Sequence, residues 1–176
     1  MRLVTLSFIL GCLLFLSSCS QIFENVDWGV VEYNDSIVEI YNAGLNEYIA
    51  YDTYYIETSW DFFDNIEKRR VDTIANLEQY TVRLEEIWGY RWDRLLVDTT
   101  IQNLQDIIDV LSNQYKELLD IYLQVESGEL DEDGYNQRII ELADEINIID
   151  NTIVERIQTN QSTFAETHNY EILPSE

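Results

Sequence analysis

Apolar residues recur every three or four positions along most of the chain, and the clearest run extends from about Thr99 to Glu126. Spacings of three and four alternate there without a break, as they do along the contact seam of a coiled coil. The seam residues are Ile101, Leu104, Ile108, Leu111, Tyr115, Leu118, Tyr122 and Val125. Thr99 and Gln102 form a capping box at the predicted start, and Gly128 can adopt the left-handed conformation that ends a helix. The pattern therefore predicts one long helix.

A second seam follows after the short stretch 127–130. Its apolar residues are Tyr135, Ile139, Leu142, Ile146, Ile149, Ile153 and Ile157. Asp131, Glu132 and Asp133 stand at the predicted start, where the positive end of the helix dipole favours negative charge. We expect this helix to end near Thr167. Because the connection is so short, the two helices should be antiparallel neighbours.

Upstream, the pattern predicts a first helix from Ser36 to about Arg69, with Ser36 and Glu39 as its capping box. One broad apolar face would include Val38, Tyr41, Leu45, Tyr48, Tyr55, Phe63 and Ile66. A second helix should run from about Asp72 to Leu96. Its pattern comprises Ile74, Leu77, Thr81, Leu84, Trp88, Arg91 and Leu95.

The boundary between these two helices is weakly marked, because no glycine or proline interrupts residues 67–72. One continuous, kinked helix over residues 36–97 is therefore an open alternative. A turn is favoured, since a helix of some 60 residues would be roughly 90 Å long and would extend beyond its partners.

Together these patterns predict an all-α fold, an up-down antiparallel bundle of four helices over residues 36–167 with long, coiled-coil-like helices. Pro174 is the single proline, which agrees with long uninterrupted elements. Residues 168–176 are expected to form a C-terminal tail. Because heptad seams can also pair between chains, a homodimer is open as well.

The first 20 residues have a different character. Met1-Arg2 is followed by an apolar stretch from Leu3 to Phe15, which is too short to span a bilayer, and then by Leu16-Ser17-Ser18-Cys19. This arrangement resembles the signal and lipobox of bacterial lipoproteins. The resemblance implies removal of residues 1–18, acylation of Cys19 and a lipidated tether over residues 19–35. An ordinary secretory signal that leaves Cys19 as a free thiol is the alternative.

The same resemblance implies a place in the cell envelope. Ser20, directly after the lipidated cysteine, is compatible with sorting to the outer membrane in a diderm cell, whereas aspartate there would favour the inner membrane. We therefore expect an anchored protein that faces the periplasm, held to the membrane by the acyl chains on Cys19.

The chain carries a formal net charge of −24 at pH 7. This charge disfavours binding to nucleic acid and to anionic lipid surfaces, which carry the same sign. It favours cationic partners, divalent cations or simple solubility. Only Lys68 and Lys116 are lysines, so adaptation to salt is an equally plain explanation.

Few residues are suited to catalysis. His168 is the only histidine, which disfavours a di-iron bundle and a histidine-based triad. Cys12 lies in the predicted signal, and Cys19 is the predicted lipidation site, so no cysteine remains as a nucleophile or metal ligand. The chain has 34 acidic residues, so a neighbouring pair such as Glu85 and Glu86 carries little information. We expect no catalytic residue, no metal and no cofactor.

Residues 129–134 partly resemble a calcium-binding EF-hand loop, with acids at the first, third and fifth positions and Gly134 at the sixth. The twelfth position should supply a bidentate glutamate, but it is Ile140. Capping of the following helix is the favoured interpretation.

The stretch 87–92 is the most unusual part of the predicted domain. Trp88 and Trp92 are four residues apart and would share one helix face, with Arg91 able to contact either ring through a cation-π interaction. Trp and Arg dominate binding hot spots, so these three residues are the candidate partner-binding site. The competing interpretation, favoured by their helical spacing, is that the rings fill one end of the bundle.

A second aromatic-rich stretch contains several rings that lie off the main seam, and we expect some of them to be exposed or covered by the tether or a partner. Its residues are Tyr51, Tyr54, Tyr55, Trp60, Phe62 and Phe63.

The function expected from the sequence is that of a non-enzymatic, membrane-anchored envelope lipoprotein. It would act as a protein-interaction module, that is, an adaptor, assembly factor or chaperone-like protein, with an envelope protein or a second copy of itself as partner. The alternative is an acidic helical lipoprotein that binds a ligand or a divalent cation.

Overall fold

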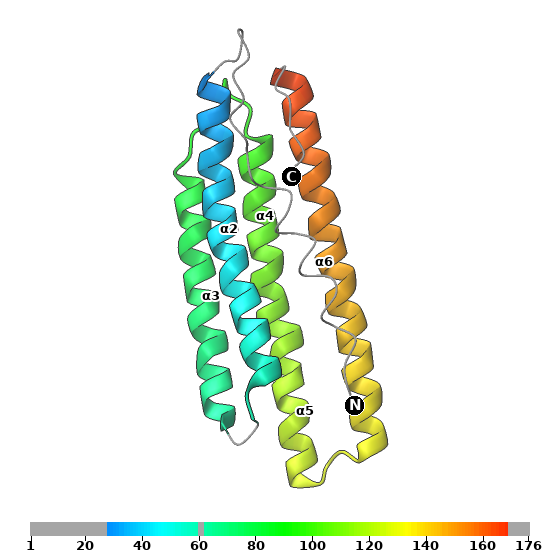
Figure 1. Ribbon diagram of the computed structural model, residues 1–176. Helices are drawn as coiled ribbons and strands as arrows, with labels where there is room; N and C mark the ends of the chain where they lie inside the picture. Colours follow the sequence, from blue (N-terminus) through cyan, green and yellow to red (C-terminus); the bar gives the residue numbers. More distant parts are fainter. Residues whose placement is uncertain (1–27, 60–61, 169–176) are drawn as a thin grey trace.

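Four long helices make up most of the part of the chain that the computed structural model describes, residues 28–59 and 62–168 (Figure 1). They are α2 (Trp28–Glu57), α3 (Phe63–Glu85), a composite helix and α6 (Glu132–His168). The composite helix consists of α4 (Leu95–Val110), the π-helical turn η3 (Leu111–Tyr115) and α5 (Lys116–Ser127). Within the described ranges no strand is formed, so the predicted all-α helical bundle is confirmed.

The composite helix has a central place in the packing. α4 contacts α2, α3 and α6, whereas α6 packs mainly on α4 (Figure 1). Large aromatic side chains fill the wider space between α2 and α6, as at Tyr33 and Phe164, whose ring centroids are 5.5 Å apart. The largest fully buried side chains include Ile37, Tyr51, Ile66, Leu77, Leu84, Leu104, Ile107, Leu111, Leu119, Leu142 and Phe164. Core residues therefore come from every helix.

The first helix boundary differs from the prediction. The chain leaves α2 after Glu57 and enters α3 at Phe63, so the predicted turn near residues 69–72 and the single continuous helix are both wrong. The reason is Arg70, which is only 7% exposed and occupies a core position of α3. Its guanidinium binds Glu67 at 2.7 Å and donates to the Leu111 carbonyl at 3.0 Å. Because charged residues usually mark a surface, the apolar pattern alone missed this position.

Both predicted capping boxes are also wrong. Ser36 lies inside α2, where its hydroxyl donates to the Glu32 carbonyl at 2.8 Å, so residues 28–35 are helical rather than part of the tether. Thr99 lies inside α4, which begins at Leu95. Ser and Thr satisfy their hydroxyls equally well within a helix by bonding to the preceding turn, so their presence does not fix a helix start.

The long third helix is confirmed, but its buried face is displaced by the π-helical turn. The extra residue in η3 rotates the side chains that follow, so Ile121 is buried whereas the predicted seam residue Val125 is 36% exposed. Gly128 ends the helix at φ +76°, as predicted.

Three predictions concern residues outside the described ranges. These are the signal segment 1–18, the lipidation site Cys19 with the following residues up to 27, and the tail beyond His168, which itself closes α6. None of the described helices is long and apolar enough to cross a membrane.

Candidate functional site

The connection between α3 and α4, residues 86–94, carries the candidate binding residues and is called the Trp loop below. The Trp88 side chain is 82% exposed and that of Trp92 is 91% exposed. The loop is not helical at these positions, so the predicted shared helix face is wrong. The core-filling interpretation is also wrong, because neither indole is buried. Arg91 stacks over Tyr90, with its guanidinium carbon 5.3 Å from the ring centroid, and not over either indole as predicted.

A tight turn forms the tip of the Trp loop. The Asp93 backbone N–H donates to the Tyr90 carbonyl at 2.8 Å, and the two residues between them have φ of +48° (Arg91) and +73° (Trp92). Positive φ at both central positions is typical of a type I′ turn, where Asn and Gly are the usual residues. A non-glycine residue in this region costs of order 1–3 kcal/mol. The loop therefore stores strain at Arg91 and Trp92, which are both exposed.

Asp93 secures the base of the Trp loop to three helices. Its Oδ1 accepts from the backbone N–H of Leu95, the first residue of α4, at 2.8 Å. Its Oδ2 lies 2.9 Å from His168 Nε2 on α6, and its carbonyl accepts from the Tyr33 hydroxyl of α2 at 3.4 Å. The side chain and the backbone carbonyl of Asp93 thus fix the loop against α2, α4 and α6.

His168, which was expected to begin the tail, is part of this base. Its side chain is only 9% exposed, and its ring lies 4.5 Å from Phe164 and 5.1 Å from Tyr90, measured between centroids. Gly89 is also required here, because a Cβ at this position would lie 2.6 Å from the Asp93 carbonyl oxygen. The base is rigidly packed, while the tip is exposed.

A second concentration of chemistry lies between α2, η3 and α6, where tyrosines surround two half-buried carboxyl groups. We call it the tyrosine cluster; its members are Tyr48, Tyr51, Asp52 and Tyr55 of α2, Tyr115 of η3 and Asp150 of α6. The Tyr115 ring makes edge contacts with three of the other tyrosines, at centroid distances of 5.2 to 6.3 Å. Its hydroxyl donates to Asp52 Oδ1.

The carboxyl groups of the tyrosine cluster are hard to ionise. The pKa of Asp150 is raised from 3.8 to about 6, chiefly by burial and also by the nearby Asp52 carboxyl group, while a hydrogen bond from Tyr48 opposes the shift. Burial likewise raises the pKa of Asp52, against the hydrogen bond from Tyr115. The Arg70 guanidinium, whose charge acts on Tyr51, is already paired with Glu67. Since two acids share one apolar site, they resist being charged together.

The sequence did not predict the tyrosine cluster. Tyr51 belongs to the aromatic-rich stretch in which some rings were expected to be exposed or covered by the tether or a partner, and it is fully buried within the bundle. Tyr115 was placed on a seam, but its partners come from segments more than 30 residues away on both sides. Only the packing of α2, η3 and α6 brings these groups together, so no local motif marks them.

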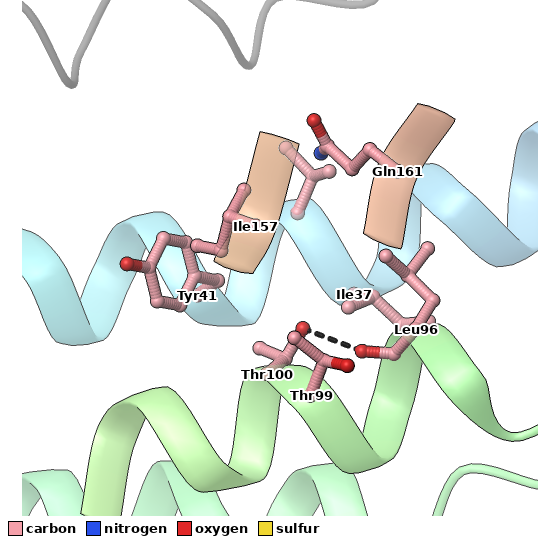
Figure 2. Close-up of a pocket in the computed structure, with 8 residues that line it drawn as sticks. Ile37, Tyr41, Leu96, Thr99, Thr100, Ile157 and Gln161 are labelled. Atoms are coloured by element: carbon pink, nitrogen blue, oxygen red, sulfur yellow. Dashed lines mark hydrogen bonds between the residues drawn. The ribbon is translucent and has the colours of Figure 1, made fainter. Parts of the chain in front are cut away.

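A shallow hollow lies between α2, α4 and α6. Figure 2 shows Ile37 and Tyr41 of α2 facing Ile157 and Gln161 of α6 across Thr99 and Thr100 of α4. The hydroxyls are already engaged: Thr100 donates to the Leu96 carbonyl at 2.8 Å, and Thr99 accepts from Asn160 at 2.8 Å. The hollow offers no arrangement of groups suited to catalysis.

The EF-hand-like stretch lies at the start of α6. Asp131 Oδ1 accepts from the Gly134 backbone N–H at 2.8 Å, which agrees with the capping interpretation. Among the described residues, no group of three or more His, Cys, Asp or Glu side chains could hold a metal ion. No family model, curated protein or solved structure matches this chain.

Proposed function

We propose that this chain is a lipid-anchored lipoprotein of the cell envelope and that it works as a non-enzymatic interaction module, with the Trp loop as its binding surface. The lipobox-like run that ends at Cys19 supports the anchor. The bundle provides a long, regular support for the loop, whose base is fixed to three helices by Asp93.

The exposure of Trp88 and Trp92 is the observation that carries this proposal. A tryptophan can bury some 150–250 Å² of surface, so two such rings in water forgo a large hydrophobic stabilisation. Tryptophan is also the residue most typical of binding hot spots. Because the base of the loop is already ordered, binding at its tip would need little further loss of conformational entropy.

Two further features support binding rather than catalysis. His168, the only histidine of the chain, is bonded to Asp93 and packed beneath the loop. The acids with raised pKa values, Asp52 and Asp150, lie among tyrosines inside the bundle. His168 thus supports the base of the loop, and the two carboxyl groups are packed against tyrosine rings.

Three kinds of partner lie within reach of an anchored loop: an envelope protein, a second copy of the chain, and the membrane surface. A photo-reactive phenylalanine analogue in place of Trp92, irradiated in native envelopes, should form an adduct with whichever of these occupies the loop. The matched control carries the same analogue in place of Val71, which is 50% exposed on α3. Equal yields at the two positions would contradict the Trp loop as the binding surface.

A further inference from the structure

The Trp loop lies at the end of the bundle where the described chain begins. α2 starts at Trp28, and its residue Tyr33 contacts the loop through the Asp93 carbonyl and through the Tyr90 ring, at a centroid distance of 5.9 Å. α6 ends at the same place, with His168 against Asp93 (Figure 1). The opposite end of the bundle is formed by the α2–α3 and α5–α6 connections (Figure 1).

The length of chain before α2 limits how far this end can be from a lipid anchor. From Cys19 to Trp28 a fully extended chain covers at most about 31 Å, at roughly 3.4 Å per residue. The composite helix, Leu95 to Ser127, is about 50 Å long at 1.5 Å per residue. An anchor at Cys19 would therefore hold the loop end of the bundle close to the bilayer.

We infer that Trp88 and Trp92 occupy the lipid interface of the membrane that holds the acyl chains of Cys19. This inference rests on the proposed anchoring of the chain. Tryptophan is enriched at the level of the lipid headgroups, where its ring meets apolar chains and its N–H meets water. The lipid interface can therefore accommodate the exposed tip of the loop without a binding pocket of complementary shape.

Anchoring makes even a weak loop contact effective. Once the acyl chains are inserted, contact between the loop and the same bilayer is an intramolecular event with a high effective concentration. Arg91, at the tip of the turn and stacked over Tyr90, adds a cation that the phosphates of anionic lipids would attract. The lipid anchor supplies the affinity, and the loop sets the orientation of the bundle.

The overall charge decides which lipids suit this contact. A net charge of −24 repels an anionic surface, and one arginine at the tip offsets little of it. Arg94, the other arginine of the loop, is engaged with Asp98 at 3.0 Å and with the Ile87 carbonyl at 2.9 Å. The contact should therefore depend on the indoles and be strongest on zwitterionic lipid.

Fluorescence quenching by brominated lipid tests this inference. The acylated full chain with Trp28→Phe and Trp60→Phe, purified from membranes, keeps Trp88 and Trp92 as its only tryptophans. It is reconstituted into phosphatidylcholine vesicles with or without bromine on the acyl chains, and flotation reports whether it is anchored. The matched control lacks all four native tryptophans and carries Val71→Trp on the exposed face of α3.

Strong quenching and a blue-shifted emission of the loop tryptophans, with an unquenched control, are the expected results. An anchored protein whose loop emission is not quenched would overturn the lipid contact while leaving the proposed anchor intact. A protein that fails to float would overturn the anchor and the inference together. In the photo-crosslinking experiment at position 92, an adduct with a protein and none with lipid would overturn the lipid contact. The loop would then be an interaction surface for a protein partner.

Discussion

The aromatic side chains of the Trp loop and those of the tyrosine cluster differ sharply in their exposure to solvent. In the loop, Trp88 and Trp92 are 82% and 91% exposed, whereas in the cluster Tyr51 is fully buried and Tyr115 is 3% exposed. The cluster even takes carboxyl groups into the bundle with its rings, at a cost that appears as raised pKa values. The loop keeps two apolar rings in water, and the backbone is strained at one of them, Trp92.

This difference distinguishes residues that are explained by packing from residues that are not. Packing accounts for the tyrosine cluster, because its rings fill the space between α2, η3 and α6. Packing does not account for Trp88 and Trp92, which add little to the core. A role other than packing, such as the proposed contact with a membrane, is the simpler reason for two exposed rings that contribute little to the fold.

The largest expected effect comes from making the same kind of truncation in both regions. Tyr51→Ala should destabilise the protein by about 3–5 kcal/mol, because it leaves a cavity in a fully buried site. Trp92→Ala should change the free energy of unfolding by no more than about 0.5 kcal/mol. Urea unfolding followed by circular dichroism measures both. If the two variants lost similar stability, the loop would belong to the core, and the comparison would fail.

The next effect concerns the carboxyl groups of the cluster. The pKa of Asp150 is about 6 in the folded protein against an ordinary 3.8, so the unfolded chain releases its proton first as the pH rises. Stability should therefore fall between about pH 4 and pH 6 and stay low above that range. Asp150→Asn should stabilise the protein at neutral pH by roughly 2–3 kcal/mol, a gain that disappears near pH 4.

Thermal and urea unfolding across this pH range check the prediction. Asp72→Asn, at an exposed position of α3, serves as the control for removing one negative charge from a very acidic chain. A gain for Asp150→Asn that is the same at both ends of the range would contradict burial as its cause.

The base of the Trp loop should show a smaller effect. Asp93→Ala removes the partner of the first N–H of α4 and of His168, and we expect a loss of about 1–2 kcal/mol. Hydrogen exchange should become faster at the start of α4. Asp98→Ala, which removes only an exposed pair with Arg94, is the control and should have little effect. Equal losses from the two variants would argue that Asp93 does not secure the loop.

The smallest effect concerns the strain at the tip. Because Trp92 has φ of +73°, Trp92→Gly should be more stable than Trp92→Ala by about 1 kcal/mol. Trp88 is not among the positive-φ residues of the described chain, so Trp88→Gly should be less stable than Trp88→Ala. The same order of stability at both positions would mean that the tip is not strained.

Periodicity predicted the fold class, the long composite helix and the antiparallel fourth helix, because apolar spacing reports directly on which face is buried. It misplaced the first helix boundary because Arg70, buried through its bonds to Glu67 and Leu111, does not look like a core residue. It could not predict η3, since a π-helical turn depends on packing around one turn.

The residues of the candidate site could be selected from the sequence, but the loop conformation and the long-range contacts that hold them could not. Trp88, Arg91 and Trp92 were recognised from composition, yet helical spacing suggested a face that does not exist. Both central residues of the turn have positive φ without being Asn or Gly, so the usual sequence signal of such a turn is missing. The bonds of Asp93 to α2 and α6 join residues at least 60 positions apart, beyond the reach of any local pattern.

The most direct test of the central claim is hydroxyl-radical footprinting of the acylated full chain on membranes and after transfer to detergent-free solution with its acyl chains removed. We predict that Trp88 and Trp92 are oxidised rapidly in solution and protected on the membrane, while labelling of the buried Tyr51 and Tyr115 stays low in both states. Equal oxidation of the two tryptophans in both states would contradict the claim that the Trp loop is a binding surface.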